Sequence, residues 1–430
     1  MATGLTPTTG SNLLKQLYSP KVIESTIAKG GSPLFGSIEH DKDGEGSLYV
    51  SPTIDSEAPS GSADFPTAQD SGNVSTLSAN QFQVPYKPIY TTFSVTNTAI
   101  VQSMGQKGGW GPLLKRASDS GLRMNAHVMS CLLVGTGFGE IGVIGSTTNL
   151  GAPVITLADA GDAGKFMKNM KLVLATAAAN GALRNAGTIG YVQSVDYVAG
   201  TVTVAATPGA ASGTNISTIW AAAATGDFIC IAGCTDGTGT IKVPVGFPGW
   251  IPPDTARPAS NDSFFNVNRS TNPLFLAGYA ANATTGALQD NVQDALTFLI
   301  GYTGTKRVVS YMNPRRWSAI AKVQQGQVRY TDIKGRAGIL MKAMSLAVEG
   351  TECELVSDRY MNLASCYAFD PTAVAYKSVQ GQLGTFMDQG DGMILVRQPS
   401  DPGVEGRIWS HGAFIVQDPS KCANIRFATS

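Results

Sequence analysis

Apolar residues recur at helical spacing from residue 113 to residue 134, and this pattern predicts the longest helix of the chain. Two adjacent apolar rows make its inner side: Leu113, Ala117, Met124, Val128, Cys131 and Leu132, then Leu114, Leu122, Ala126, Met129 and Leu133. Polar residues form the predicted outer side: Arg116, Asp119, Arg123, His127 and Ser130. Pro112 suits the first helical turn and Gly135 suits the end. At a rise of about 1.5 Å per residue, this spine is roughly 35 Å long.

Strand-like patterns precede the helix on either side of a weakly apolar stretch, residues 55–80. Leu48–Ile54 reads as one strand, and the alternation of Phe82, Val84, Tyr86, Tyr90, Phe93 and Val95 predicts further strands. We interpret residues 39–101 as a long two-stranded arm with a flexible tip. An isolated hairpin is marginal in water, so the arm is expected to lie on a surface. The alternative is a disordered acidic loop.

After the helix, the pattern changes twice. Residues 150–245 alternate over short stretches and predict a small β-barrel or sandwich, with strands at 154–157, 172–175, 188–197, 201–206 and 227–232. Residues 287–301 and the segment after Asn313-Pro314 have helical periodicity. Strands are predicted between and after these helices at 308–312, 353–356, 365–369, 373–377 and 393–397, with a last one at 407–416. Alternating strands and helices favour an α/β domain.

Composition sharpens this picture. The 430 residues are enough for two to four domains, and 31 basic residues balance 31 acidic ones. A net charge of zero argues against nucleic-acid binding as the main task, since phosphate recognition needs a basic excess. Only 14% of the residues are charged, which suits a surface that is partly buried against other subunits.

The charges are unevenly distributed along the chain. Before Lys87, the arm carries eight acids against Lys42 alone, a net charge of −7: Glu39, Asp41, Asp43, Glu45, Asp55, Glu57, Asp64 and Asp70. The outer side of the predicted helix carries Lys115, Arg116 and Arg123 against Asp119. The arm and the helix can therefore pair within one molecule or between copies, although solvated surface charges contribute little individually.

No catalytic, metal-binding or cofactor-binding constellation is predicted. The three histidines, His40, His127 and His411, are far apart, and we interpret His127 as a surface residue. Cys230 and Cys234 have roughly zinc-like spacing, but no second pair completes four ligands, so buried thiols are the better interpretation. Gly135–Gly139 follows a helix rather than a strand, and Asp236–Thr240 reads as a tight turn. We therefore predict a protein that is not an enzyme.

Cellular location is constrained by what the chain does not carry. Six thinly spread cysteines favour reduced thiols and synthesis in the cytoplasm. The N-terminus lacks the pattern of a secretory signal, and no run of 18 apolar residues predicts a membrane span.

The order of these parts resembles the major capsid protein of tailed bacteriophages, which has the Hong Kong 97-like fold. The residues that carry the resemblance are Ile155–Phe166, Phe264–Gly278, Tyr311–Trp317, Val328–Gly335, Asp358-Arg359 and Asp370. The resemblance implies an α+β fold with a spine helix, an extended β-hairpin called the E-loop, an axial α/β domain and an inserted small β domain. Its parts would be an N-terminal arm (1–38), the E-loop (39–101), a peripheral domain with the spine helix (102–149), the insertion (150–245), a return to the peripheral domain (246–286), the axial domain (287–400) and a C-terminal strand (401–430).

The resemblance also implies a function. Copies would assemble as hexamers and pentamers into an icosahedral virion shell around packaged dsDNA, which is touched non-specifically. Scaffolding, portal and decoration proteins are possible partners, the chain would be made in the bacterial host cytoplasm, and no membrane or cofactor is involved. The E-loop would lie on the neighbouring subunit, which makes candidates for inter-subunit contact of Glu45, Glu57, Asp64, Asp70, Arg116 and Arg123. Some relatives cross-link through a loop lysine, but none lies between Asp43 and Tyr86, so a non-covalent shell is expected.

Two other functions are open from the residues alone. The first is a β-rich surface or adhesion protein that binds carbohydrate through residues 150–245, whose Thr, Tyr and Trp220 content allows it. The second is an enzyme with an unrecognised site.

Overall fold

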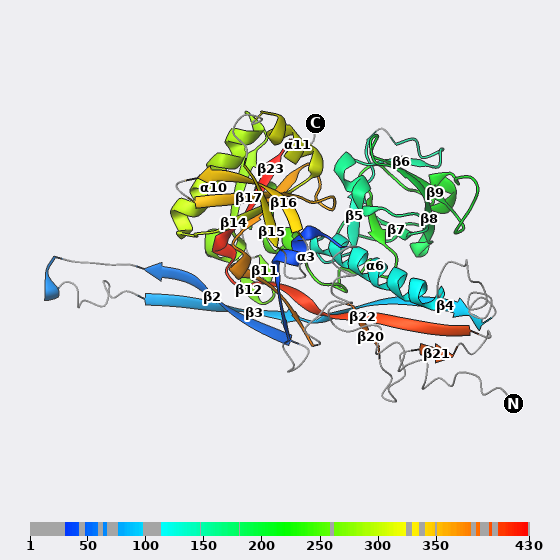
Figure 1. Ribbon diagram of the computed structural model, residues 1–430, viewed down its shortest axis with the longest axis horizontal. Helices are drawn as coiled ribbons and strands as arrows, with labels where there is room; N and C mark the ends of the chain where they lie inside the picture. The colour runs from blue at the N-terminus through cyan, green and yellow to red at the C-terminus, as the bar shows by residue number, and fades with distance from the viewer. Residues whose placement is uncertain are drawn as a thin grey trace.

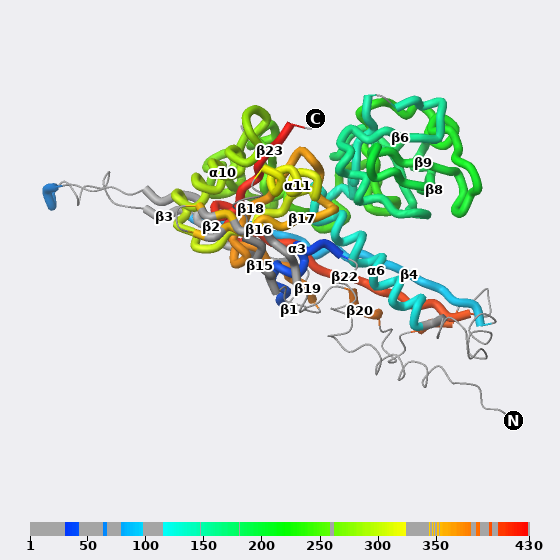
Figure 2. Tube along the Cα trace, turned by 45° about the horizontal axis from the view of Figure 1, so that its top comes forward, coloured from blue at the N-terminus to red at the C-terminus, as the bar shows by residue number. Residues whose placement is uncertain are grey.

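The computed structural model describes residues 31–42, 48–58, 63–66, 76–97, 113–146, 148–179, 181–258, 262–323, 329–334, 340–348, 351–379, 384–387, 395–397 and 403–428. An elongated base carries two sheet-containing units on one side, and a long hairpin extends from one end (Figures 1 and 2). Most of the predicted N-terminal arm, residues 1–30, and Pro112 lie outside the described residues.

The base is a six-stranded sheet organised by β22 (Gly403–Val416). This strand pairs with β4 (Lys87–Thr96), β19 (Val374–Ser378), β20 (Thr385–Phe386) and β21 (Leu395–Arg397). Parallel pairing with β19 adds β1 (Glu39–Lys42), where Lys377 Nζ lies 2.5 Å from Asp41 Oδ2. β1 was expected in the hairpin arm, but its backbone pairs here instead. β19, β20 and β21 likewise join β22, so strand pairing does not follow the predicted boundary at residue 400.

The predicted spine is α6 (Leu113–Leu133), which lies along the β4–β22 pair. At Gly121 a Cβ atom would come within 2.9 Å of both Phe93 and Ile408, so glycine permits this close packing. The predicted faces are wrong at three residues. Met124 is 54% exposed, whereas His127 and Ser130 are buried. The helix contacts other segments on more than one side, so its buried face is wider than its apolar stripe.

The segment before β1, which is the end of the predicted N-terminal arm 1–38, is docked against the spine. Its short helix α3 (Pro33–Ser37) is capped by Ser32, whose side chain accepts the Leu34 N–H. Leu34, Phe35 and Ile38 are buried, and the Phe35 and Phe414 rings lie 5.7 Å apart between centroids. Apolar burial therefore fixes residues 32–38 of the predicted arm 1–38.

The hairpin consists of β2 (Leu48–Ala58) and β3 (Thr76–Pro85), which pair antiparallel with a bulge near Ile54. Its base sits in an aromatic socket: Phe82 is fully buried, and its ring centroid lies 5.3 Å from that of Trp250. The Gln83 N–H donates to the carbonyl of Phe265, at 3.1 Å. Beyond the socket, the two strands extend away from the body (Figure 1).

The socket belongs to a connecting segment of short elements: α8 (Phe247–Trp250), η3 (Asp254–Ala256), β11 (Ser263–Phe264), β12 (Val267–Asn268) and α9 (Pro273–Ala277). Phe265 and Asn266 form the turn between β11 and β12 with φ values of 47° and 68°. Non-glycine residues rarely adopt this conformation. In this conformation the Phe265 ring contacts the rings of Trp250 and Phe264.

The first unit on the base is a six-stranded sheet in the order β5-β10-β7-β8-β9-β6. Its strands are β5 (Glu140–Val143), β6 (Val154–Thr156), β7 (Lys171–Ala175), β8 (Gly190–Asp196), β9 (Thr201–Ala205) and β10 (Phe228–Ile231), with η1 (Ala160–Lys165), η2 (Arg184–Gly187) and α7 (Ile216–Ile219) between them. The edge strands meet, because Ile144 and Leu157 form a bridge and the Ala158 N–H donates to the Val143 carbonyl at 2.9 Å. The sheet thus closes on itself, and its first strand precedes the predicted start at residue 150.

The second unit is a seven-stranded mixed sheet in the order β13-β23-β18-β14-β17-β16-β15. Its strands are β13 (Tyr279–Ala283), β14 (Val308–Met312), β15 (Arg329–Lys334), β16 (Leu340–Val348), β17 (Thr351–Ser357), β18 (Ser365–Phe369) and β23 (Cys422–Phe427). Helices α10 (Leu288–Thr303) and α11 (Pro314–Val323) pack on it, and η4 (Pro371–Ala373) and η5 (Pro419–Lys421) lead into β19 and β23. The predicted C-terminal strand is therefore two strands, and they belong to different sheets.

Candidate functional site

The outer face of α6 is the first candidate surface, since both predicted basic candidates lie on it. Arg116 and Arg123 are exposed on this helix, two turns apart, together with Lys115. Met124 lies beside Arg123 and is more than half exposed. An exposed methionine with basic neighbours is suited to an acidic partner segment that also carries apolar groups. This face therefore agrees with the predicted outer side at Arg116 and Arg123, but not at His127 and Ser130, which are buried.

The acidic candidates of the arm are only partly placed. Glu45 and Asp70 lie outside the described residues, and Glu57 lies on β2. Asp64 is exposed in the described segment 63–66, where its neighbour Phe65 is 71% exposed. The hairpin and α6 extend toward opposite ends of the molecule (Figures 1 and 2). The subunit therefore does not bring its own hairpin onto the outer face of α6.

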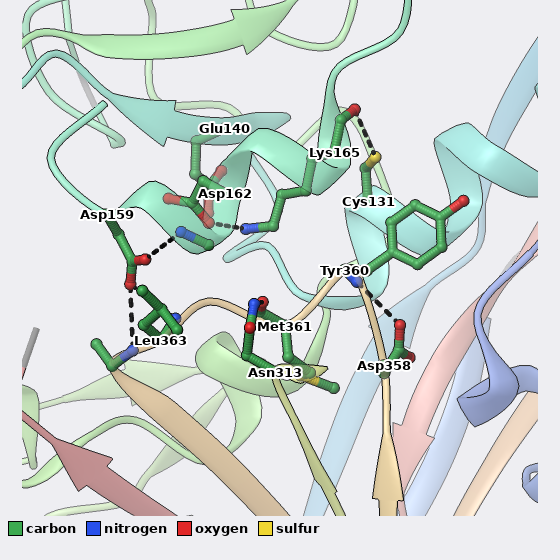
Figure 3. Close-up of polar contacts among 12 residues, drawn as sticks. Cys131, Glu140, Asp159, Asp162, Lys165, Asn313, Asp358, Tyr360, Met361 and Leu363 are labelled. Atoms are coloured by element: carbon green, nitrogen blue, oxygen red, sulfur yellow. Dashed lines mark hydrogen bonds and ion pairs between the residues drawn. The ribbon is translucent and has the colours of Figure 1, made fainter. Parts of the chain in front are cut away.

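A second candidate is a buried cluster between the spine and the two units, which we call the polar junction (Figure 3). Figure 3 labels Cys131 of α6, Asp159, Asp162 and Lys165 at η1, Asn313 before α11, and Asp358, Tyr360, Met361 and Leu363 after β17. His127 of α6 also belongs to the junction through its contacts with Lys165 and Tyr360. Apart from Met361 and Leu363, these are polar side chains that burial penalises unless each finds a partner.

Asp159 joins the closed sheet directly to the loop after β17, and Asn313 holds that loop from within the mixed-sheet unit. One oxygen of Asp159 accepts the Gly161 N–H at 2.7 Å, and the other accepts the Leu363 and Ala364 N–H groups at 2.9 and 3.1 Å. Asn313 donates to the Met361 carbonyl at 2.7 Å and accepts the Arg315 N–H at 3.0 Å. At Gly164 a Cβ atom would lie 2.3 Å from the Arg359 carbonyl oxygen, so only glycine permits this approach.

Lys165 and Asp162 form a buried ion pair inside the junction. Their charged atoms lie 2.7 Å apart, and their side chains are 5% and 10% exposed. Burial opposes the charge on Lys165, but contact with Asp162 outweighs it and raises the pKa of the lysine. The ammonium group therefore keeps its proton, and the pair stabilises the fold only while both partners are present.

His127 links three parts of the chain as a neutral imidazole. Its Nε2 atom lies 2.9 Å from the Lys165 carbonyl oxygen, which can only accept, so Nε2 carries the proton. Nδ1 then accepts from the Tyr360 hydroxyl at 2.9 Å, and that hydroxyl accepts from Arg359 at 2.6 Å. Burial, together with the nearby Arg359 guanidinium, lowers the pKa of His127 to about 4.

We expect the subunit to lose stability as the pH falls from about 6.5 to about 4. The unfolded histidine, with a pKa of about 6.5, binds its proton at a higher pH than the folded one, so protonation favours unfolding by about 3 kcal/mol. Urea unfolding of the dissociated subunit at pH 7.5 and 4.5 measures this loss. A His127→Gln variant removes the histidine's share, so equal losses in the variant and the wild type would contradict the prediction.

Asp358 fastens the N-terminal segment to the junction. The Ser32 hydroxyl and the Tyr360 N–H both donate to its carboxylate, the latter at 2.9 Å. The Ser32 N–H donates to Ser130 of α6 at 2.8 Å, and Ser130 in turn donates to the Ala126 carbonyl. Burial raises the pKa of Asp358, although these donors act in the opposite direction. The junction thus also holds the start of the described chain.

All six cysteines are buried and free, and burial raises the pKa of the Cys131 thiol to about 12. Among the described residues, no group of three or more His, Cys, Asp or Glu could hold a metal ion. No helix in the described part of the chain is long and apolar enough to cross a membrane.

Sequence reasoning missed the junction. The segments Ile155–Phe166 and Asp358-Arg359 supported the resemblance, but no role was predicted for their charged residues. A usable signal was present in Asp159-Ala-Gly-Asp-Ala-Gly164. This stretch places two carboxylates among small residues, which allow another backbone segment to come close. The carbohydrate hypothesis is weakened, since Trp220 is fully buried and its indole N–H donates to the Thr188 carbonyl at 2.7 Å.

Comparison with known proteins identifies the fold. No protein-family model and no curated protein matches this sequence. The capsid asymmetric unit of cyanophage A-1(L) matches with 11% identity and a TM-score of 0.51, over 93% of this chain and 93% of that chain. The capsid of a native GTA particle (10% identity, 94% and 90% covered, TM-score 0.42) and the procapsid of satellite phage P4 (11%, 95% and 100%, 0.40) are more distant. The cyanophage match shows that this chain has a mixed helix-and-sheet fold of the phage capsid type.

Proposed function

We propose that this chain is the major capsid protein of a tailed bacteriophage, and that its copies assemble as hexamers and pentamers into an icosahedral shell around packaged dsDNA. The observation that carries the proposal is the fold shared with the cyanophage capsid across 93% of both chains. The low charge content supports the proposal further, and so does the hairpin, whose strands extend away from the body of their own subunit. In this proposal the subunit catalyses no reaction, and it adopts slightly different conformations in hexamers and pentamers.

The parts of the Hong Kong 97-like fold map onto the elements as follows in this proposal. The hairpin β2–β3 is the E-loop, α6 is the spine helix, the base sheet belongs to the peripheral domain, the mixed sheet is the axial domain, and the closed sheet is the insertion. The E-loop of one subunit lies on the outer face of α6 in its neighbour. Complementary charge sets the register, while buried apolar area provides most of the free energy.

Negative-stain microscopy of the purified protein tests this function. Closed shells of uniform size are the expected result, because each subunit makes several weak contacts that closed symmetry couples. Shells boiled in denaturant with reductant should run as a single monomer band on electrophoresis, since residues 43–86 contain no lysine. Monomers with glycan affinity would favour the adhesion alternative, and a ladder of multimers would contradict the non-covalent shell.

A further inference from the structure

Four aromatic rings form a continuous row along the outer side of α10. The row consists of Phe275, Tyr279, Phe298 and Tyr302, whose successive centroid distances are 4.1 Å (Tyr279 to Phe298), 5.7 Å (Phe298 to Tyr302) and 6.4 Å (Tyr302 to Phe275). Phe298 and Tyr302 are 42% and 50% exposed, and their planes differ by only 6°. Rings that hold each other in place lose little entropy on binding, so they are preorganised anchors for a protein partner.

The charges on α10 argue against the row pairing with a second copy of itself. Arg257, whose charge acts on Tyr279, is only partly exposed and lies outside this helix. α10 carries Asp290 and Asp294, both exposed, and it contains no Lys or Arg. A two-fold contact between two rows would bring four carboxylates together, and like charges in an interface are costly. The partner surface should therefore be basic and partly apolar.

The same unit presents such a surface on α11. This helix contains no acidic residue. Arg315 and Arg316 at its start donate to backbone carbonyls of the same subunit, whereas Lys322 lies at its other end. Lys322 is exposed next to Val323, which is 75% exposed. α10 and α11 pack on the same face of the mixed sheet, and Figure 1 shows them at separate places on that unit. Opposite charges at two separate places on one unit favour a head-to-tail contact, and a head-to-tail contact that closes produces a ring.

We propose that the aromatic row of one copy docks on the Lys322–Val323 end of α11 in the next copy, and that this contact closes the capsomer ring. The proposal rests on the proposed function, because it assigns the contact to rings of capsid subunits. Phe298 and Tyr302 bury their exposed faces against the partner's Val323, and Asp294 lies near the partner's Lys322. Aromatic anchors of this kind carry most of the binding energy in protein interfaces.

Paired substitutions in the full chain test the contact. Phe298→Ser/Tyr302→Ser, Asp294→Lys and Lys322→Glu are each expected to lower the yield of rings and shells at least about tenfold. The double variant Asp294→Lys/Lys322→Glu should recover assembly, because it reverses the charge on both sides. Light scattering after gel filtration measures rings, and negative-stain microscopy counts shells. Circular dichroism shows that the subunits are folded, and Val198→Ser and Lys168→Glu are controls at exposed positions of the closed sheet.

The outcomes separate this inference from the proposed function. Wild-type shells together with full assembly of Phe298→Ser/Tyr302→Ser would overturn the inference and leave the capsid function standing. Unchanged assembly of Lys322→Glu, or failure of the double charge reversal to recover assembly, would show that the row contacts another surface. Either result would also overturn the inference. A wild type that forms neither rings nor shells would count against both.

Discussion

Reversing Arg116 and Arg123 to glutamate should abolish shell formation while the subunit stays folded. Both side chains are exposed on the outer face of α6, so neither substitution disturbs the core. Glutamate is a good helix former, and near the start of α6 at Leu113 it is favoured by the helix dipole. The substitutions should therefore weaken the contact between α6 and the neighbour's hairpin, because two attractive contacts become repulsive in every copy of a symmetric shell.

Negative-stain particle counts measure this effect, and thermal unfolding of the subunit checks its fold. Lys168→Glu/Lys171→Glu is the matched control, because it changes the net charge equally at exposed positions of the closed sheet. Adding Glu57→Lys and Asp64→Lys to the α6 variant should restore some assembly if the acidic hairpin is the partner. Normal particles from Arg116→Glu/Arg123→Glu would remove the outer face of α6 from the contact.

Elements with strong local patterns were predictable from the sequence. The strands 308–312 and 365–369 match β14 and β18 in full, and the helix predicted at 287–301 is α10 with small shifts at its ends. In the mixed sheet, the strands β13, β15, β16 and β23 were missed. β13 consists of Tyr, Ala and Asn residues, and it is a strand because it pairs in parallel with β23, more than 130 residues away. Local preference cannot reveal a pairing of that kind.

The polar junction was hidden for a related reason. His127 was interpreted as exposed because it is polar and lies among Arg123 and Ser130 on one side of the helix. Its burial depends on partners at residues 165 and 360, which come from the closed sheet and from the loop after β17. A buried polar group is permitted only by its hydrogen bonds, and the sequence did not show that these residues meet. Arg116 and Arg123 were placed correctly because an arginine side chain on a helix is normally exposed.

Removing the ammonium group of Lys165 should have the largest effect on subunit stability. Lys165→Met leaves Asp162 buried without its cationic partner, and breaking a buried pair in this way typically costs about 3–5 kcal/mol. Asp162 would then take up a proton. Below pH 4, a carboxyl whose pKa is raised by folding is protonated in both the folded and the unfolded state, so it does not lower the stability. Above pH 4 the unfolded carboxyl ionises first, so the variant should become less stable as the pH rises.

Urea unfolding of the dissociated subunits at pH 5 and pH 8 measures both the loss and its pH dependence. Lys168→Met removes an exposed lysine three residues away and should change the free energy of unfolding by less than about 0.5 kcal/mol. Asp162→Leu/Lys165→Met should recover most of the stability, because an apolar pair of similar volume has no charge to desolvate. The backbone carbonyl of residue 165 still accepts from His127 in each variant, so the effect isolates the ion pair. If Lys165→Met were as stable as the Lys168→Met control, the pair would not be a stabilising link in the junction.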